Sequence, residues 1–112
     1  KTILNKKEFE IMKNGVVIIN TARGEIIDEK ALIQALNYGK VGAAGLDVFE
    51  REPPEQKSPF SEFKQVILTP HVAGLSEQAA KAMAISSVQN VIDYFDGKLN
   101  QSLIVNRKRL LD

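Results

Sequence analysis

The chain has 112 residues, the size of one small domain, and its 44% apolar and 26% charged residues are ordinary for a folded protein and exclude intrinsic disorder. The formal net charge of +1 gives no long-range field that would favour nucleic acid or a membrane surface. The sequence has no cysteine, which excludes disulfides, thiolate metal sites and a cysteine nucleophile. No apolar run approaches the ~20 residues of a membrane helix, and we expect a cytoplasmic protein.

The first predicted element is a helix that begins after Asn5. Asn5 can cap this helix, and Glu8, three residues further on, can complete a capping box. Gly15 is expected to stop the helix. Residues 16–19 then form a continuous β-branched run, VVII, which is typical of a strand that is covered on both faces in a parallel sheet.

A second helix is predicted over residues 29–36. Asp28 is its expected cap, and Gly39 is its expected end. The apolar residues that share one face of this helix are Leu32, Ala35 and Leu36. Residues 41–46 are predicted to form a second strand. The small side chains in this run would let a neighbouring segment pack closely against it.

A loop rich in proline and charge, residues 50–65, separates the second strand from a third at residues 66–68. Ser76 can cap a long helix that extends to about residue 96, and an apolar stripe over residues 80–95 runs along it. The tail contains one apolar stretch, residues 103–105, which is expected to be extended.

This order of elements predicts an α/β fold with a parallel sheet and helical crossovers. In an open sheet of this kind, ligands bind beyond the carboxyl ends of the strands. Arg23 follows the first strand, Asp47 ends the second, and His71, the only histidine, follows the third. Glu52 lies a few residues beyond Asp47. The four side chains are therefore expected at one edge of the sheet.

The chemistry of this set suits a substrate that carries a carboxylate. Each residue alone has an ordinary structural or solvated role, and their position at successive strand ends is what points to a site. An arginine binds a carboxylate through two parallel hydrogen bonds, and a histidine can give or take a hydroxyl proton. A carboxylate beside the histidine would orient its ring. A single histidine and no cysteine leave only oxygen ligands, so no metal site is predicted.

Three blocks of the sequence resemble the signatures of the D-isomer-specific 2-hydroxyacid dehydrogenases, a family that includes phosphoglycerate dehydrogenase-like and hydroxypyruvate reductase-like enzymes. The first block is VIINTARGEIID, residues 17–28. The second is GLDVFE, residues 45–50, which leads to EPP at residues 52–54. The third is LTPHVAG, residues 68–74. The order and spacing of the blocks are kept, and the similarity extends to about residue 97.

The resemblance implies a fold and a set of roles. Residues 1–74 would be the C-terminal half of a Rossmann-type domain that binds NAD or NADP, and residues 75–112 a helix and tail that return to a separate substrate lobe. Arg23 would bind the substrate carboxylate, His71 would be the acid–base group, and Glu52 would pair with His71. The cofactor-binding residues that the resemblance implies are Thr21, Ala22, Arg23, Asp47, His71, Val72, Ala73 and Gly74. Among them, Asp47 would accept a hydrogen bond from the nicotinamide carboxamide.

One departure from the family concerns the Gly-x-Gly-x-x-Gly loop that holds the cofactor phosphates, which these 112 residues do not contain. We therefore expect a fragment of an oxidoreductase for 2-hydroxy or 2-oxo acids, inactive by itself and self-associating through the stripe at residues 80–95. Because Glu52 stands where formate-oxidising relatives differ, formate is not favoured as the substrate. An NAD(H)-sensing protein that resembles corepressors of the same architecture remains an alternative, as does a dimerisation piece with vestigial site residues.

Overall fold

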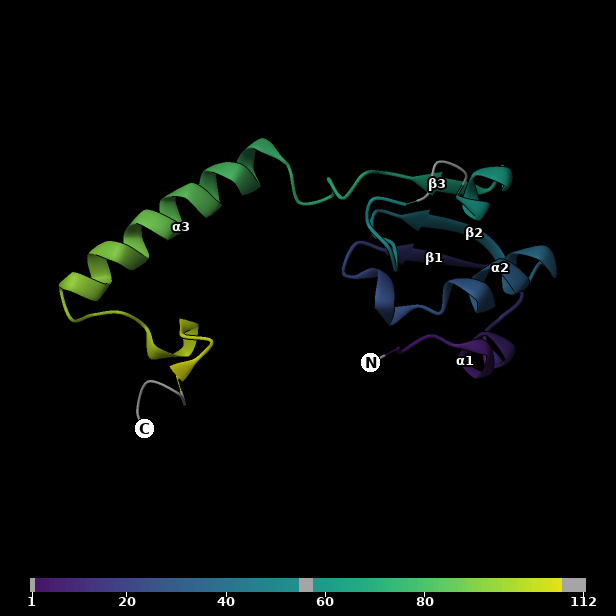
Figure 1. Ribbon diagram of the computed structural model, residues 1–112, viewed down its shortest axis with the longest axis horizontal. Helices are drawn as coiled ribbons and strands as arrows, with labels where there is room; N and C mark the ends of the chain where they lie inside the picture. Colours follow the sequence, from purple (N-terminus) through teal and green to yellow (C-terminus); the bar gives the residue numbers. More distant parts are fainter. Residues whose placement is uncertain (1, 55–57, 108–112) are drawn as a thin grey trace. The chain divides into compact units, whose positions relative to one another are not determined.

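The computed structural model describes residues 2–54 and 58–107 (Figure 1). The chain divides into two compact units, Lys1–Ala73 and Gly74–Asp112. In the described part of the first unit lie helices α1 and α2 and all the strands of one sheet, whereas the second unit contains the long helix α3. The residues with predicted chemistry, apart from Gly74, therefore belong to the first unit.

Helix α1 (Lys6–Ile11) begins as predicted, because the capping box of Asn5 and Glu8 is present. The Glu8 carboxylate accepts a hydrogen bond from the Asn5 backbone N–H at 3.0 Å. The helix ends at Ile11, earlier than the glycine that was expected to stop it. Gly15 instead has a φ of +73° in the turn that leads to the first strand.

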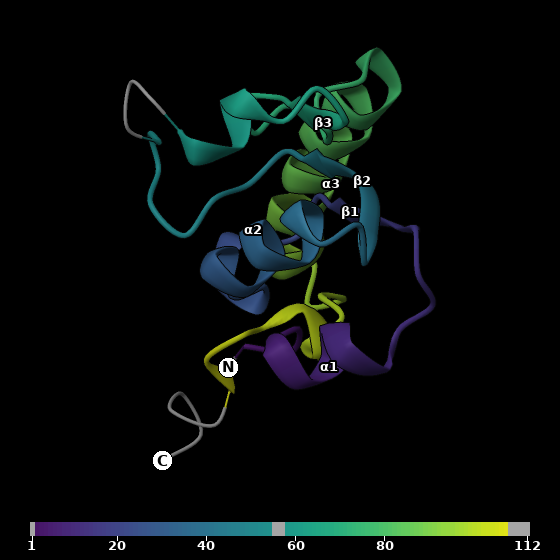
Figure 2. The ribbon, with the colours of Figure 1, turned by 90° about the vertical axis from the view of Figure 1, so that its right-hand side faces the viewer.

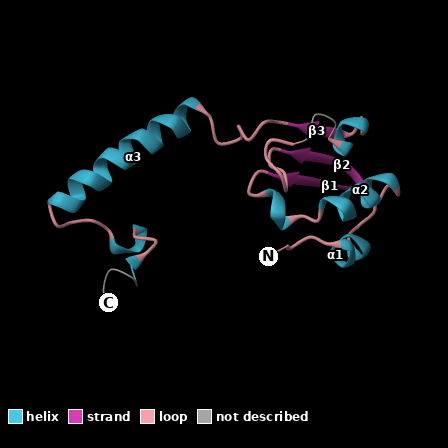
Figure 3. Ribbon diagram, viewed as in Figure 1, coloured by secondary structure: helices cyan, strands magenta, loops and turns pink. Residues whose placement is uncertain are grey.

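The predicted α/β fold is confirmed by three parallel strands in the order β1-β2-β3 (Figure 3). The strands are β1 (Val16–Asn20), β2 (Val41–Leu46) and β3 (Val66–Leu68). Helix α2 (Glu29–Asn37) connects the first two strands, and Figure 2 shows it beside the sheet. Short 3-10 helices, η1 (Gly24–Ile26) and η2 (Pro59–Glu62), lie in the connections.

Within the first unit, one face of the sheet is covered and the other carries exposed side chains. The register places Ile18 beside Ala44 and Asn20 beside Leu46, and all four residues are buried. The alternate residues of β1, Val17 and Ile19, are 61% and 75% exposed, and Ile67 of β3 is 71% exposed. The expectation that the first strand is covered on both faces is therefore wrong for the described chain. The reason is that the helices described in this unit pack on one side of the sheet.

Helix α2 supplies much of the core on the covered face. Asp28 caps it as predicted, because its carboxylate accepts a hydrogen bond from the Ala31 backbone N–H at 3.0 Å. The core cluster of the described residues comprises Phe9, Ile18, Ile27, Ala31, Leu32, Ala35, Leu36, Val41, Ala44, Leu46, Phe49 and Phe60. Phe49 comes from the loop after β2, so this loop is anchored in the core beside the strand ends.

Helix α3 (Glu77–Phe95) has the predicted cap, in which Ser76 accepts a hydrogen bond from the Ala79 backbone N–H at 3.1 Å. None of its residues is buried. The extended tail predicted at residues 103–105 is wrong, because Leu103 ends a 3-10 helix, η3 (Gln101–Leu103). Asn100 explains the difference, since its side chain accepts a hydrogen bond from the Ser102 backbone N–H and favours a turn. Within residues 2–54 and 58–107, no helix is long and apolar enough to cross a membrane.

Candidate active site

The carboxyl ends of the three strands are joined to one another by backbone hydrogen bonds. The Asn20 carbonyl at the end of β1 accepts from the Asp47 N–H at 3.0 Å. The Leu46 carbonyl at the end of β2 accepts from the Thr69 N–H, also at 3.0 Å. The predicted site residues lie in or next to the loops that follow these strands. The hydrogen bonds between the strand ends therefore fix the positions at which these loops begin.

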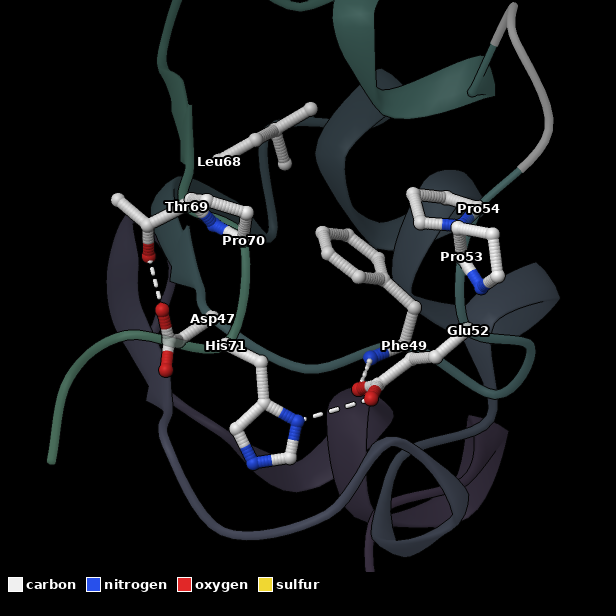
Figure 4. Close-up of a pocket in the computed structure, with 9 residues that line it drawn as sticks. All are labelled: Asp47, Phe49, Glu52, Pro53, Pro54, Leu68, Thr69, Pro70 and His71. Atoms are coloured by element: carbon white, nitrogen blue, oxygen red, sulfur yellow. Dashed lines mark hydrogen bonds and ion pairs between the residues drawn. The ribbon is translucent and has the colours of Figure 1, made fainter.

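His71 and Glu52 form a direct pair. The Glu52 Oε2 atom lies 2.8 Å from His71 Nδ1, while Glu52 Oε1 accepts a hydrogen bond from the Phe49 backbone N–H at 3.1 Å. Figure 4 shows the histidine ring and the carboxylate facing each other. The pair is half exposed, with 50% of the His71 side chain and 38% of the Glu52 side chain accessible. Because Nδ1 faces Glu52, the Nε2 atom on the other side of the ring is left for a substrate.

The surroundings of Glu52 favour its charged form. The hydrogen bond with His71 lowers the pKa of Glu52 most, and the Phe49 N–H lowers it further. The positive charges of His71 and Arg23 lower this pKa as well, while partial burial opposes them. Glu52 is therefore a carboxylate at neutral pH, and Arg23 lies near enough for its charge to act on it.

Asp47 is buried, with 3% of its surface exposed, and holds the loop that carries His71. Its Oδ1 atom accepts hydrogen bonds from the Thr69 hydroxyl and from the Val72 backbone N–H, the latter at 2.9 Å. Its Oδ2 atom accepts from the Ala73 backbone N–H at 2.9 Å. The hydrogen bond from Thr69 is the main reason that the pKa of Asp47 is lowered, and both backbone N–H groups add to it. Three donors around one buried carboxylate fix the course of this loop.

The backbone of His71 has an unusual conformation, with a φ of +55°. It is the only residue other than glycine with a positive φ among residues 2–54 and 58–107. A side chain in this left-handed region strains the backbone by about 1–3 kcal/mol, so the conformation persists only where its surroundings impose it. The His71 N–H donates to the Asp47 carbonyl at 2.9 Å, so Asp47 holds this residue through its backbone as well as through its carboxylate.

Arg23 lies in the loop that follows β1 and is exposed, as are its neighbours Thr21 and Ala22. Its guanidinium donates to the Ala22 carbonyl at 2.6 Å. The next residue, Gly24, is buried against the loop after β2: a Cβ atom on it would lie 1.9 Å from the carbonyl carbon of Phe49. Only glycine permits this approach, which brings the Arg23 loop against the segment that leads to Glu52.

A hollow of about 340 Å³ lies beside the Glu52–His71 pair (Figure 4). Its wall is mostly apolar, and the residues that form it are Asp47, Phe49, Glu52, Pro53, Pro54, Leu68, Thr69, Pro70 and His71. Phe49 belongs to the core, so one wall of the hollow is rigid. The pair is thus flanked by a surface that favours an apolar ligand group over water.

The structure brings together Glu52 and His71, and it places Asp47 in contact with Val72 and Ala73. Gly74 is exposed and begins the second unit. The described residues contain no group of three or more side chains that could hold a metal ion. Sequence reasoning missed Asn20 and Gly24. A polar residue that continues a buried β-branched run was the available signal for Asn20, and nothing in the local pattern revealed the close contact of Gly24.

Known proteins with similar sequences belong to the family that the sequence blocks resemble. The family model of the D-isomer specific 2-hydroxyacid dehydrogenase NAD binding domain matches residues 1–73. The glyoxylate/hydroxypyruvate reductase B of Enterobacter sp. (strain 638) is 39% identical over 102 residues, which are 91% of this chain and 32% of that protein. The D-3-phosphoglycerate dehydrogenase of Archaeoglobus fulgidus is 39% identical over 95 residues, which are 85% of this chain and 18% of the relative. The chain thus spans a third or less of these curated relatives.

Among solved structures, the D-isomer specific 2-hydroxyacid dehydrogenase from Xanthobacter autotrophicus Py2, in complex with NADPH and MES, superposes with a TM-score of 0.81 at 32% identity. The match covers 97% of this chain and 44% of that structure. The parallel sheet, the strand-end residues and the family match over residues 1–73 lead to one assignment. The chain belongs to the D-isomer specific 2-hydroxyacid dehydrogenase family and carries sequence of its NAD binding domain.

Proposed function

We propose that this chain carries the substrate-binding and acid–base residues of an NAD- or NADP-dependent oxidoreductase. This enzyme would interconvert 2-oxo acids and D-2-hydroxy acids. The observation that carries the proposal is the contact between His71 Nδ1 and Glu52 Oε2, 2.8 Å apart, beside the loop of Arg23. An acid–base pair next to an arginine is the set of groups that such a reaction requires. The relatives named as a glyoxylate/hydroxypyruvate reductase and a D-3-phosphoglycerate dehydrogenase support the same substrate class.

Arg23 is proposed to bind the carboxylate of the substrate. A guanidinium offers parallel N–H groups that match a carboxylate, and these charge-assisted hydrogen bonds are strong and directional. Arg23 is exposed at the strand edge, and its guanidinium donates a hydrogen bond to the neighbouring Ala22 carbonyl. Binding through the carboxylate would turn the adjacent 2-oxo carbon toward His71.

His71 is proposed to protonate the oxygen of the 2-oxo group during reduction and to take the proton back during oxidation. Its Nδ1 atom is held by Glu52, so Nε2 is the atom that would carry the proton to or from the substrate. Glu52 would stabilise the imidazolium and keep the ring oriented, since its other oxygen is bound to the Phe49 N–H. Glu52 thereby links the acid–base group to the rigid core.

The residues proposed to hold the nicotinamide fit it by the chemistry of their groups. Thr21 and Ala22 present small side chains and backbone groups at the end of β1, which a flat ring can approach. Asp47 offers a carboxylate acceptor to a carboxamide, in addition to the donors it already binds. Val72, Ala73 and Gly74 would line the other side of the ring. The cofactor, when bound, supplies the hydride, and the protein supplies binding, orientation and the proton.

The proposed cofactor is NAD or NADP. The family model is that of an NAD binding domain, and the Xanthobacter relative holds NADPH.

No Gly-x-Gly-x-x-Gly loop occurs in the sequence, and the chain spans 32% of the Enterobacter relative. We therefore propose that residues 1–112 alone do not turn over. Steady-state reduction of glyoxylate or hydroxypyruvate by this chain alone would contradict that proposal.

The proposed role of His71 is tested in the full-length protein that contains this chain. His71→Gln keeps a polar side chain but cannot carry the proton, so turnover should fall by about a hundredfold or more, the usual contribution of a positioned acid–base group. The affinity for NADH, measured by fluorescence titration, should stay within about twofold of wild type, because His71→Gln leaves the three donors to Asp47 in place. Near-normal turnover would remove His71 from this role.

The corepressor alternative receives no support from the relatives reported above, which are named as a reductase and dehydrogenases. A turnover assay with the full-length protein separates the two functions directly. A corepressor would bind NADH without reducing any 2-oxo acid.

Self-association of the chain is a further part of the proposal. The exposed large apolar side chains of α3 are Met83, Ile85, Val88, Val91, Ile92, Tyr94 and Phe95. Many exposed apolar side chains on one helix favour association, and a net charge of +1 opposes the approach of a second copy only weakly. We expect a dimer through α3, which Val88→Glu in the middle of the helix should dissociate in sedimentation velocity. A monomer at high concentration for the unmodified chain would contradict this expectation.

A further inference from the structure

Asn20 is a buried polar residue that the proposed chemistry does not use. It ends β1 on the covered face of the sheet, beside Leu46, and only 3% of its surface is exposed. Burial of an amide without hydrogen bonds is unfavourable by several kcal/mol, so a residue of this kind must find partners. An apolar side chain of the same size would pack at this position without that requirement. Packing of the core therefore does not explain why a polar residue stands at position 20.

Both functional groups of the Asn20 side chain bind the loop that carries Arg23. The Nδ2 atom donates to the Arg23 carbonyl at 3.0 Å, and Oδ1 accepts from the Ala22 backbone N–H at 3.1 Å. The assignment of the amide is fixed by these partners, because a reversed amide would place an oxygen against the carbonyl. The two bonds close the chain from residue 20 to residue 23 into a single hydrogen-bonded turn.

The turn holds the backbone of Arg23 through its carbonyl group, while Arg23 itself is exposed at the surface. Asn20 is itself tied to the neighbouring strand, because its carbonyl accepts from the Asp47 N–H at 3.0 Å. Arg23 is thus connected through Asn20 to the residue that holds the His71 loop. A guanidinium whose backbone is fixed in this way loses less freedom when it binds a carboxylate than one on a loose loop.

We propose that Asn20 is a positioning residue, which holds Arg23 in the orientation that binds the carboxylate of the substrate. The inference depends on the proposed function, in which Arg23 is the group that touches the substrate. Only a side chain that donates and accepts at once can make both bonds. Asp would lack the donor for the Arg23 carbonyl, and Leu would lack both groups while keeping the branch at Cγ.

The test uses the full-length protein with Asn20→Leu, and with Asn14→Leu as the matched control. The Asn14 side chain accepts a hydrogen bond from the Lys40 ammonium group, and Asn14 lies ahead of β1, at the other end of the strand. Asn20→Leu should raise the KM for glyoxylate by about tenfold, a coupling typical of residues in one hydrogen-bond network. The KM for NADH should rise less than the KM for glyoxylate, because Ala22 is bound to the same turn whereas the loop of Asp47 and His71 is intact. Asn14→Leu should change neither KM.

A double-mutant cycle with Arg23→Ala distinguishes positioning from a general structural effect. If Asn20 acts through Arg23, Asn20→Leu should change the KM for glyoxylate by less than about twofold once Arg23 is alanine. An undiminished, multiplicative effect of Asn20→Leu in that background would overturn the inference and leave the proposed function standing. An unchanged KM for glyoxylate in Arg23→Ala itself would overturn both.

A second variant keeps the inference testable if Asn20→Leu does not fold. Asn20→Ser retains a hydroxyl that can donate and accept, and it places no apolar group at the strand end. It should show the same selective rise in the KM for glyoxylate, smaller than the rise in Asn20→Leu. Equal changes in the KM for glyoxylate and for NADH in Asn20→Ser would overturn the positioning role.

Discussion

The contact between Gly24 and the loop after β2 leads to a quantitative prediction for Gly24→Ala. A Cβ atom at this position would lie 1.9 Å from the carbonyl carbon of Phe49, 2.0 Å from its oxygen and 2.3 Å from the Glu50 nitrogen. Carbon atoms in van der Waals contact are about 3.5–4.0 Å apart, so the two loops would have to separate by roughly 1.5 Å. The atoms that clash belong to the backbone, and no change of side-chain rotamer can relieve them.

The size of the effect follows from the position of Phe49 in the core, where it is 8% exposed. Overpacking of a well-packed site lowers the free energy of unfolding by about 1–3 kcal/mol, and a backbone clash belongs at the upper end. For a unit of this size, each kcal/mol lowers the Tm by about 4–8 °C. Gly24→Ala should therefore lower the Tm of the first unit by roughly 10–20 °C.

Gly45→Ala is the matched control, because it adds the same methyl group elsewhere in the same unit. Its Cβ would meet only Ile19 Cγ1, at 3.9 Å, which is an ordinary contact. Its free energy of unfolding should equal that of wild type or exceed it by about 0.4–1 kcal/mol, since alanine restricts the unfolded chain. The assay is urea denaturation followed by far-UV circular dichroism, with hydrogen exchange of the β1 and β2 amides to isolate this unit. If Gly24→Ala and Gly45→Ala unfold at the same urea concentration, the reasoning from the contact is refuted.

Two further predictions concern a carboxylate at the strand edge and a helix cap. The pKa of Asp47 in the folded state is lowered chiefly by the hydrogen bond from the Thr69 hydroxyl. The charged carboxylate therefore stabilises the fold fully at pH values above its ordinary pKa of 3.8. This stabilisation is lost as the pH falls through the lowered pKa of the folded state. Urea titrations over this range should show a shallower loss of stability for Asp47→Asn than for wild type, and equal pH profiles would contradict the prediction. Asp28→Ala removes the cap of α2 and should lower the free energy of unfolding by about 1 kcal/mol, whereas Glu25→Ala, at an exposed position, should change it by less than about 0.5 kcal/mol. Equal urea midpoints for these two variants would count against the cap.

Much of the fold could be predicted because its signals are local. The caps at Asn5, Asp28 and Ser76 each depend on residues within three positions, and all of them form. The common edge of the strand ends follows from the parallel sheet alone, and it brings Glu52 to His71 at 2.8 Å. These features need no knowledge of how distant segments pack.

The features that sequence reasoning missed depend on distant contacts. The run at residues 16–19 looks buried throughout, but whether a helix covers the side with Val17 and Ile19 is decided by tertiary packing. Gly24 does not have a left-handed φ, so conformational freedom is not the reason for glycine. The reason is a backbone segment 25 positions further along the chain, at Phe49, which no local pattern reveals.

The two buried polar residues of the core explain how loops can carry this chemistry. Asn20 and Asp47 are the residues in the described chain that are both polar and buried, and each binds the loop that follows a strand end. A loop is ordinarily the most mobile part of a fold, and the proposed acid–base group would lose freedom at every turnover if its loop were mobile. His71 instead has a left-handed backbone whose N–H donates to the Asp47 carbonyl. We therefore propose that the buried amide and the buried carboxylate serve the orientation of Arg23 and His71, since their hydrogen bonds go to the loops that carry these residues.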